Sequence, residues 1–184
     1  MKSKGEGQGQ VHSQGVRVWD LPVRLLHWAL ACAIAAAWIT GERIGPLHEW
    51  IGYGAVAIVG ARLLWSLKGN PYARFSQFVT PPRVALAYLR QVAAGVPARH
   101  LGHNPAGGAM VVALLACVTL VGLSGWAMTT DLLWGYAWPV RLHTALAWLL
   151  VILIALHVTG VLLASWQHRE NLVKAMLTGF KRSD

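Results

Sequence analysis

The sequence LHTALAWLLVILIALHVTGVLLASWQ, residues 142–167, contains no Asp, Glu, Lys or Arg. At about 1.5 Å of rise per residue, a helix of this length exceeds the roughly 20 residues that cross the hydrocarbon core of a bilayer. The stretch also lacks the alternation of apolar and polar residues that is typical of a membrane β-barrel strand. It therefore predicts a transmembrane helix.

Further stretches have the same length and apolar character, and we predict four spans: 21–40, 46–67, 106–128 and 139–166. The composition agrees, because 55% of the 184 residues are hydrophobic and only 12% are charged, which is too apolar for an ordinary soluble domain. Only helices and closed barrels satisfy their backbone in lipid. We predict an all-α, integral membrane four-helix bundle over residues 18–184, preceded by a disordered tail over residues 1–17.

Local signals mark where three of these helices begin. Asp20 is a suitable N-cap for the first helix, with Pro22 in its first turn. Pro46 and Pro139 stand at the expected starts of the second and fourth helices, where a proline is tolerated because its missing N–H would have no partner.

Two short turns, 41–45 and 129–138, lie at one end of the bundle, which we call the short-turn end. The long connection 66–105 and both tails lie at the other, the connection end. Of the 16 Lys and Arg residues, only Arg43 and Arg141 lie at the short-turn end. Since cytoplasmic segments are enriched in Lys and Arg, we expect both termini to lie in the cytoplasm. The net charge of +9 is then a topology signal, and nucleic-acid binding is not expected.

Four histidines lie inside the predicted spans, where an unpaired imidazole is costly. By helical rise, His48 and His143 lie roughly 3 to 6 Å below the short-turn surface. His27 and His157 lie roughly 9 to 14 Å from the connection-end surface. We call His48 and His143 the short-turn pair, and His27 and His157 the connection-end pair.

His143 and His157 belong to one predicted helix and are 14 residues apart. That separation is nearly four turns, so both lie on one face, about 21 Å apart along the axis. The first and second helices supply the facing histidines, His27 and His48. Two imidazoles at each of two depths are typical of bis-histidine haem ligation. We therefore expect two stacked haem b groups, with iron ligands His27/His157 and His48/His143, which pass electrons and do not readily bind oxygen.

Haem is not the only way to account for buried histidines. A single buried histidine is more simply explained by a hydrogen bond to a carbonyl, although four matched by depth and face are not. Zinc or copper normally requires more ligands, with carboxylate or thiolate support. Cys32 and Cys117 lie in spans without the motif for covalent haem attachment, so we expect them to pack. A haem-free membrane anchor and a metal-ion transporter are the competing classes.

Several neighbouring residues are candidate cofactor contacts. Gly52 lies one turn from His48. We expect His100 and His103 to be solvated or capping groups. For His103, the alternatives are a quinone-side proton donor and a haem-edge contact. Four arginines near helix ends are suited to haem propionates, although snorkelling or topology explains them as well: Arg24, Arg62, Arg43 and Arg141. Four glycines in the third span fit either helix packing or the approach of a porphyrin edge: Gly107, Gly108, Gly122 and Gly125.

The run VWDLPVRLLHW, residues 18–28, resembles the opening of the bacterial cytochrome b561 proteins, especially the branch with the cytochrome b subunits of nickel-iron hydrogenases. The resemblance runs nearly end to end. It includes Leu47-His48 with Gly52-Tyr53, GHNP at 102–105, the spacing of His143 and His157, and HRENLV at 168–173. By resemblance, the connection-end and short-turn pairs are the axial ligands of two b-type haems.

The resemblance implies electron exchange between the membrane quinone pool and a redox partner of the respiratory chain. Such partners include a periplasmic cytochrome c, a membrane dehydrogenase or a hydrogenase. Some similar proteins look like superoxide-to-quinone oxidoreductases, which is a second expectation. No catalytic side chain is expected beyond the haem ligands, and a homodimer is left open.

Overall fold

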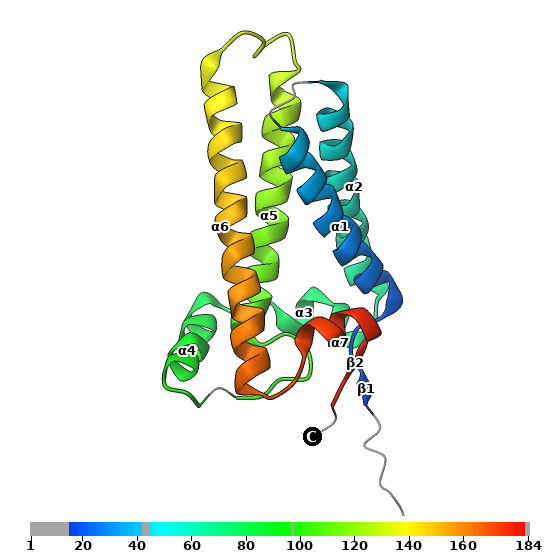
Figure 1. Ribbon diagram of the computed structural model, residues 1–184, viewed down its shortest axis with the longest axis vertical. Coiled ribbons are helices and arrows are strands. Elements are labelled where there is room, and N and C mark those ends of the chain that lie inside the picture. Colours follow the sequence, from blue (N-terminus) through cyan, green and yellow to red (C-terminus); the bar gives the residue numbers. More distant parts are fainter. Residues whose placement is uncertain (1–14, 42–44, 97, 183–184) are drawn as a thin grey trace, which may run out of the picture.

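The computed structural model describes residues 15–41, 45–96 and 98–182 (Figure 1). Most of the expected tail, 1–17, and Arg43 therefore lie outside the described residues. Four long helices form the body: α1 (Leu21–Thr40), α2 (Pro46–Lys68), α5 (Pro105–Met128) and α6 (Ala137–Gln167). Each is long and apolar enough to cross a membrane. The all-α membrane bundle is confirmed, with bounds within two residues of those expected.

The remaining elements are short and lie at the connection end. They are β1 (Val16–Arg17), the 3-10 helix η1 (Pro71–Ala73), α3 (Phe75–Phe78), α4 (Pro82–Ala93), α7 (Leu172–Thr178) and β2 (Phe180–Lys181). Residues 129–136 join α5 to α6 at the opposite end, which is uppermost in Figure 1.

Capping side chains fix the starts of two spans. The Asp20 carboxylate accepts a hydrogen bond from the Val23 N–H at 3.1 Å, and Asn104 accepts one from the Gly107 N–H at 2.6 Å. Such caps satisfy donors that the first turn of a helix leaves free. The expected cap at Asp20 is confirmed. Helix α6 begins at Ala137, so Pro139 lies within its first turn.

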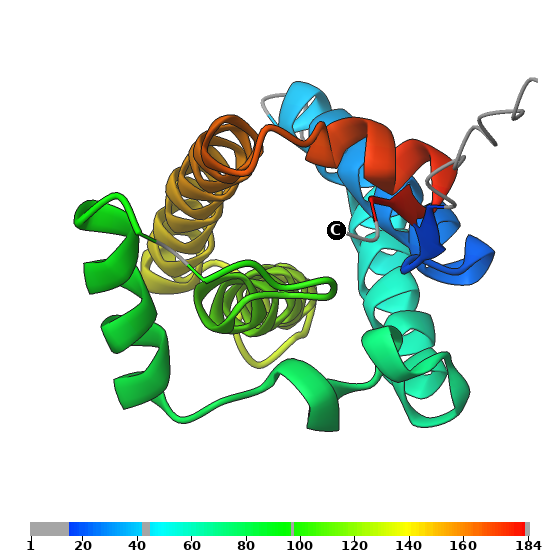
Figure 2. The same ribbon diagram turned by 90° about the horizontal axis from the view of Figure 1, so that it is seen from below.

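The helices pack in the order α1, α2, α5, α6. The closest packing joins α1 to α2, α2 to α5, and α5 to α6. Among the described residues, α6 is not extensively packed against α1 or α2, and Figure 2 shows its ribbon standing apart from both. Helix α6 is therefore held mainly by α5, and one of its faces points across the bundle toward α1 and α2.

An apolar layer fills the middle of the bundle. Its buried residues come from α2, α5 and α6: Ala55, Val59, Cys117, Val118 and Leu150. Side chains of α1, including Leu30 and Ile34, pack against it. Cys117 is therefore a packing residue, as expected, and its thiol donates a long hydrogen bond of 3.6 Å to the Leu146 carbonyl. Cys32, by contrast, is exposed on α1.

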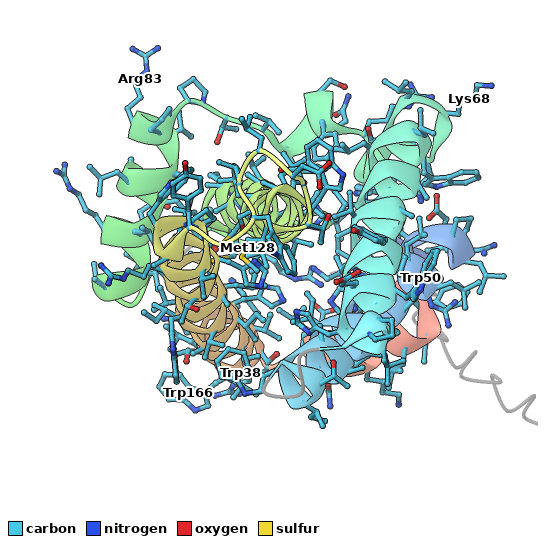
Figure 3. All side chains as sticks on the ribbon, turned by 90° about the horizontal axis from the view of Figure 1, so that it is seen from above. Trp38, Trp50, Lys68, Arg83, Met128 and Trp166 are labelled. Carbon is cyan, nitrogen blue, oxygen red and sulfur yellow. The ribbon has the colours of Figure 1, made fainter. Side chains whose placement is uncertain are left out.

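The outer surfaces of the spans are apolar. Large exposed side chains include Leu64, Trp126 and Ile152, which are 70%, 55% and 55% exposed. In a soluble protein such a surface would aggregate, whereas in a bilayer it faces lipid. Charged side chains lie at the rim: Figure 3 shows Arg83 pointing outward from α4 and Lys68 at the end of α2.

The two ends of the described chain form a clasp, which we define as β1, β2 and Gly179. Val16 and Arg17 pair with Lys181 and Phe180 in an antiparallel ladder. The Gly179 carbonyl also accepts hydrogen bonds from the Val18 and Trp19 N–H groups at 2.9 and 3.1 Å. Residues 16 and 17 therefore pair with residues that are far away in sequence.

Candidate functional site

The short-turn pair is placed by α2 and α6. The ring centroids of His48 and His143 are 6.1 Å apart. The His48 Nδ1–H donates to the Ala37 carbonyl at 3.0 Å, and the His143 Nδ1–H donates to the Val121 carbonyl at 3.1 Å. Both Nδ1 atoms are thus occupied by hydrogen bonds to carbonyls, which leaves each Nε2 as the nitrogen with a free lone pair.

The connection-end pair is placed by α1 and α6. The ring centroids of His27 and His157 are 6.5 Å apart, and the Trp28 ring lies edge-on to His27 at 5.1 Å. Among the described residues, the buried His27 Nδ1 has no hydrogen-bond partner. Both rings are half-buried. The two predicted pairs are therefore brought together in space.

These distances fit an iron atom between the two rings of each pair. A metal–imidazole bond of about 2 Å, plus about 1.1 Å from nitrogen to ring centroid, places two rings on opposite sides of one metal about 6 Å apart. Both pairs meet this value. Within the described ranges, no three His, Cys, Asp or Glu side chains gather as a metal site, so the ligand set suits a cofactor that supplies its own equatorial ligands.

The two pairs occupy separate levels. Leu150 lies seven residues from both His143 and His157 on α6 and belongs to the buried apolar layer. The separation of α6 from α1 and α2 leaves the pairs as the polar bridges above and below that layer. Two flat groups, one at each level, therefore fit the bundle better than one extended group.

Glycines of α5 have two different roles. A Cβ at Gly122 would overlap Val56 Cγ2 on α2, and one at Gly108 would overlap the Phe78 carbonyl of α3. Helix packing explains these two. A Cβ at Gly125 would lie 3.2 Å from His143 Cε1, so this glycine makes room for a histidine ring. A Cβ at Gly52 on α2, one turn from His48, would meet nothing within 4 Å, so no packing contact requires a glycine there.

The candidate arginines differ sharply. The Arg24 Nη2 donates to the Leu177 carbonyl at the end of α7, which joins α1 to the C-terminal segment. Arg141 is exposed at the short-turn end. Arg62 is buried, with 8% of its surface exposed. The structure therefore separates residues that the sequence left equivalent.

His100 and His103 have different surroundings. His100 is exposed, and its ring lies 5.5 Å from that of Tyr88. The His103 ring lies 4.7 Å from that of Trp19 and 4.5 Å from that of Phe78, and its Nδ1 is buried. Burial, aided by the positive charges of Arg62 and Lys181, lowers the pKa of His103 to about 3. His103 is therefore a neutral imidazole between two aromatic rings, which makes it a poor acid at neutral pH.

Two side chains near the pairs could not be singled out from the sequence. Ser124 Oγ lies 3.1 Å from His143 Nδ1, next to the Val121 carbonyl. Trp65 Nε1–H donates to the Asp20 carboxylate at 3.0 Å and ties α2 to the start of α1. A serine near a predicted helix end carries no distinctive pattern. Trp65 is, in sequence, one more interfacial tryptophan, so only its tertiary placement reveals its role.

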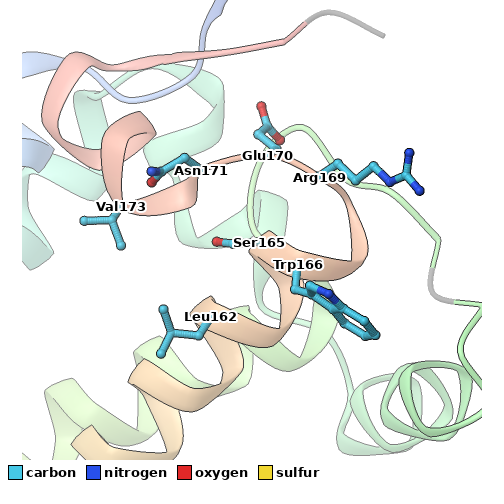
Figure 4. Close-up of a pocket in the computed structure, with 7 residues that line it drawn as sticks. All are labelled: Leu162, Ser165, Trp166, Arg169, Glu170, Asn171 and Val173. Carbon is cyan, nitrogen blue, oxygen red and sulfur yellow. The ribbon is translucent and has the colours of Figure 1, made fainter.

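A pocket of about 390 Å³ lies apart from the histidines, where α6 ends and α7 begins (Figure 4). It is open to the outside and contains none of the predicted site residues. Its lining comes from the last turns of α6 and the following turn: Leu162, Ser165, Trp166, Arg169, Glu170, Asn171 and Val173. The histidine pairs therefore remain the candidate site.

Four spans that carry two facing histidine pairs define a class of protein, the multi-pass membrane cytochromes of b type. Comparison with known proteins supports this class. Residues 18–179 match the family described as prokaryotic cytochrome b561, and the chain belongs to that family. No solved structure matches the chain.

Its relatives include proteins named as probable Ni/Fe-hydrogenase B-type cytochrome subunits. Those of Azotobacter chroococcum mcd 1 and Azotobacter vinelandii are each 26% identical over 96% of this chain and 93% of the relative. That of Rhodobacter capsulatus is 26% identical over 90% of this chain and 81% of the relative. The resemblance to the hydrogenase-associated branch is confirmed, and the chain binds haem b as a membrane electron-transfer protein.

Proposed function

We propose that the chain carries two haem b groups and moves electrons across a bacterial inner membrane, between the quinone pool and a redox partner. The observation that supports this proposal most directly is the presence of two facing histidine pairs. Their ring centroids are 6.1 and 6.5 Å apart, and one member of each pair lies on the same face of α6. His48 with His143, and His27 with His157, are the proposed ligands. A haem held by two imidazoles would supply one-electron transfer and would not readily bind oxygen.

Different residues of the chain orient the proposed ligands and exclude water. The Ala37 and Val121 carbonyls orient the short-turn pair, and the apolar layer around Leu150 keeps water out of the space between the levels. Because both members on α6 belong to one helix, the two levels are held at a fixed separation.

The proposed partner is a membrane-associated redox enzyme, since the relatives carry the names of hydrogenase cytochrome subunits. The concentration of Lys and Arg at the connection end supports a cytoplasmic location for both termini. The protein would then connect a partner at one face of the inner membrane with quinone dissolved in the bilayer.

Haem counting tests the cofactor. We expect the pyridine haemochrome of purified protein to give about two haem b per chain, and His143→Ala and His157→Ala each to lose about half of it. His100→Ala is the matched control, because His100 is exposed and belongs to neither pair; it should keep both. A single haem in the wild type, or a full complement in either pair variant, would contradict the two-haem assignment.

Sided electron transfer tests the function. In liposomes with ferricyanide trapped inside, a quinol added outside should be oxidised by the wild type. His143→Ala should still have its remaining haem reduced by quinol but should pass electrons to the trapped acceptor far more slowly, because one level is missing. Equal rates in both proteins would exclude a path through both levels. Reduction of the haems by superoxide, with quinone as the acceptor, would instead favour the superoxide-to-quinone function.

A further inference from the structure

Arg62 carries a buried positive charge near the connection end of α2. Its Nη2 donates to the Ala73 carbonyl at 3.1 Å, and its guanidinium carbon lies 5.5 Å from the centroid of the Phe75 ring. Its Nη1 is buried and has no partner among the described residues. A neutral carbonyl and a ring face compensate poorly for the water that a guanidinium loses on burial, so this site lacks an anion.

No carboxylate in the described part of the chain forms an ion pair with Arg62, although the charge of Asp20 acts on it from a longer distance. The one ion pair there joins Arg99 to Glu170 at 3.8 Å. Asp20 is the acidic residue at this end of α1, and its carboxylate already accepts hydrogen bonds from the Val23 N–H and from Trp65 Nε1–H. The free Nη1 of Arg62 is therefore left to pair with an anion that the chain does not supply at hydrogen-bond distance.

Further unsatisfied atoms lie at the same end. All the buried side-chain atoms without a partner in the described ranges belong to residues of the connection-end half: Arg24 Nε, His27 Nδ1, Arg62 Nη1, Thr80 Oγ1 and His103 Nδ1. A chain of ring contacts, Phe75 to Phe78 at 5.2 Å and Phe78 to His103 at 4.5 Å, connects Arg62 with His103. In the described part of the short-turn half there is no such set, because its histidines donate to carbonyls.

Depth places Arg62 at the level of the connection-end pair. It lies six residues from the end of α2 at Lys68, and His27 lies six residues from the start of α1 at Leu21. Both are therefore about 9 Å from the helix ends at that surface. A group bound between His27 and His157 would thus lie at the level of the guanidinium.

We propose that Arg62 binds a propionate of the haem held by His27 and His157, with the His103 Nδ1–H as a second donor. This inference rests on the proposed function. A guanidinium matches a carboxylate with two parallel hydrogen bonds, which satisfies its free Nη1. Arg24 also has a buried nitrogen without a partner in the described ranges, but it lies about one turn nearer the connection-end surface than His27 and extends to the C-terminal segment, where it donates to the Leu177 carbonyl. Arg141 is exposed at the opposite end.

Redox titration tests this assignment in a His143→Ala background, which isolates the connection-end haem. Arg62→Gln should lower the midpoint potential of that haem, because a nearby positive charge disfavours the ferric state. Arg62→Lys should restore part of the shift, and Arg90→Gln, an exposed arginine on α4, should leave the potential unchanged. Arg62→Gln should also release this haem to apomyoglobin about tenfold faster, as expected for one lost charge-assisted hydrogen bond.

Haem dimethyl ester, which lacks free propionates, provides the decisive comparison and requires no variant that might fail to fold. Supplied to membranes that contain the haem-free chain, it should leave wild type about as fast as natural haem leaves Arg62→Gln. The Arg62→Gln effect should then disappear. Unchanged potential and release in Arg62→Gln, or an effect that persists with the ester, overturns the inference. A wild type that binds no haem overturns the proposed function instead.

Discussion

The histidines of the two pairs differ in what their Nδ1 atoms contact. His48 and His143 donate to main-chain carbonyls, whereas His27 Nδ1 has no partner in the described part of the chain. Donation from Nδ1–H to a carbonyl gives the opposite nitrogen more imidazolate character, which favours the ferric state of a bound iron. Two chemically identical ligand pairs are thus made unequal by their neighbours.

We expect two midpoint potentials, with the lower one belonging to the short-turn centre. The buried charge of Arg62 near the other centre acts in the same direction, because it raises that potential. A potentiometric titration of the wild type should show two components, and His143→Ala should remove the lower one. Loss of the higher component in that variant would reverse the assignment.

His103 makes stability depend on pH. Its pKa of about 3 in the folded protein, lowered chiefly by burial, compares with about 6.5 in an unfolded chain. Below pH 6.5, His103 therefore binds a proton in the unfolded state but not in the folded state. The free energy of unfolding falls as the pH falls.

We expect the thermal unfolding midpoint of the haem-free, detergent-solubilised protein, in which no propionate faces His103, to drop between pH 7.5 and pH 5. In His103→Phe, which keeps an aromatic ring between Trp19 and Phe78 but cannot titrate, the drop should be smaller. His100→Phe, at an exposed position, should follow the wild type. An identical pH dependence in His103→Phe and wild type would show that His103 takes up its proton in the folded state as easily as in the unfolded chain.

At the scale of elements, the contact of α2 with α5 depends on one missing side chain. A Cβ at Gly122 would overlap Val56 Cγ2, and the β-branched valine on a helix has little freedom to move away. We expect Gly122→Ala to destabilise the protein by about 1–3 kcal/mol, as overpacking usually does. Thermal unfolding in detergent measures the change.

Gly60→Ala on α2 is the matched control, because a Cβ there meets nothing within 4 Å. It should be neutral or slightly stabilising, since alanine favours a helix over glycine. Val56→Ala should restore most of the stability lost in Gly122→Ala. A double variant as unstable as Gly122→Ala alone would mean that a different contact at Gly122 causes the loss.

The spans and the histidine pairing could be predicted from sequence because both follow from local rules. Apolar length and Asp20 with its following proline fix α1, and helical rise alone places His143 and His157 on one face. The clasp could not, because strands of two residues carry no periodic pattern. Nor could the ring contacts of His103, which depend on where Trp19 and Phe78 meet in space.

At the scale of the whole molecule, the distribution of charge predicts its orientation. We expect a cysteine at Leu132, which is 81% exposed in the short turn, to react with a membrane-impermeant maleimide in intact cells, in a background without Cys32 and Cys117. A cysteine at Arg83 on α4 should react only after the cells are opened. The reverse pattern of labelling would place both termini outside the cytoplasm.

Helix α6 runs without a break from Ala137 to Gln167, and its single proline lies in the first turn. Any tilt or translation of α6 therefore moves His143 and His157 together and leaves the distance between them unchanged. Tunnelling of electrons between the centres would be insensitive to such motions. The rate of electron transfer through this protein would then depend on the relative potentials of the centres and on access of reactants at the two ends. The distance between the centres would stay constant.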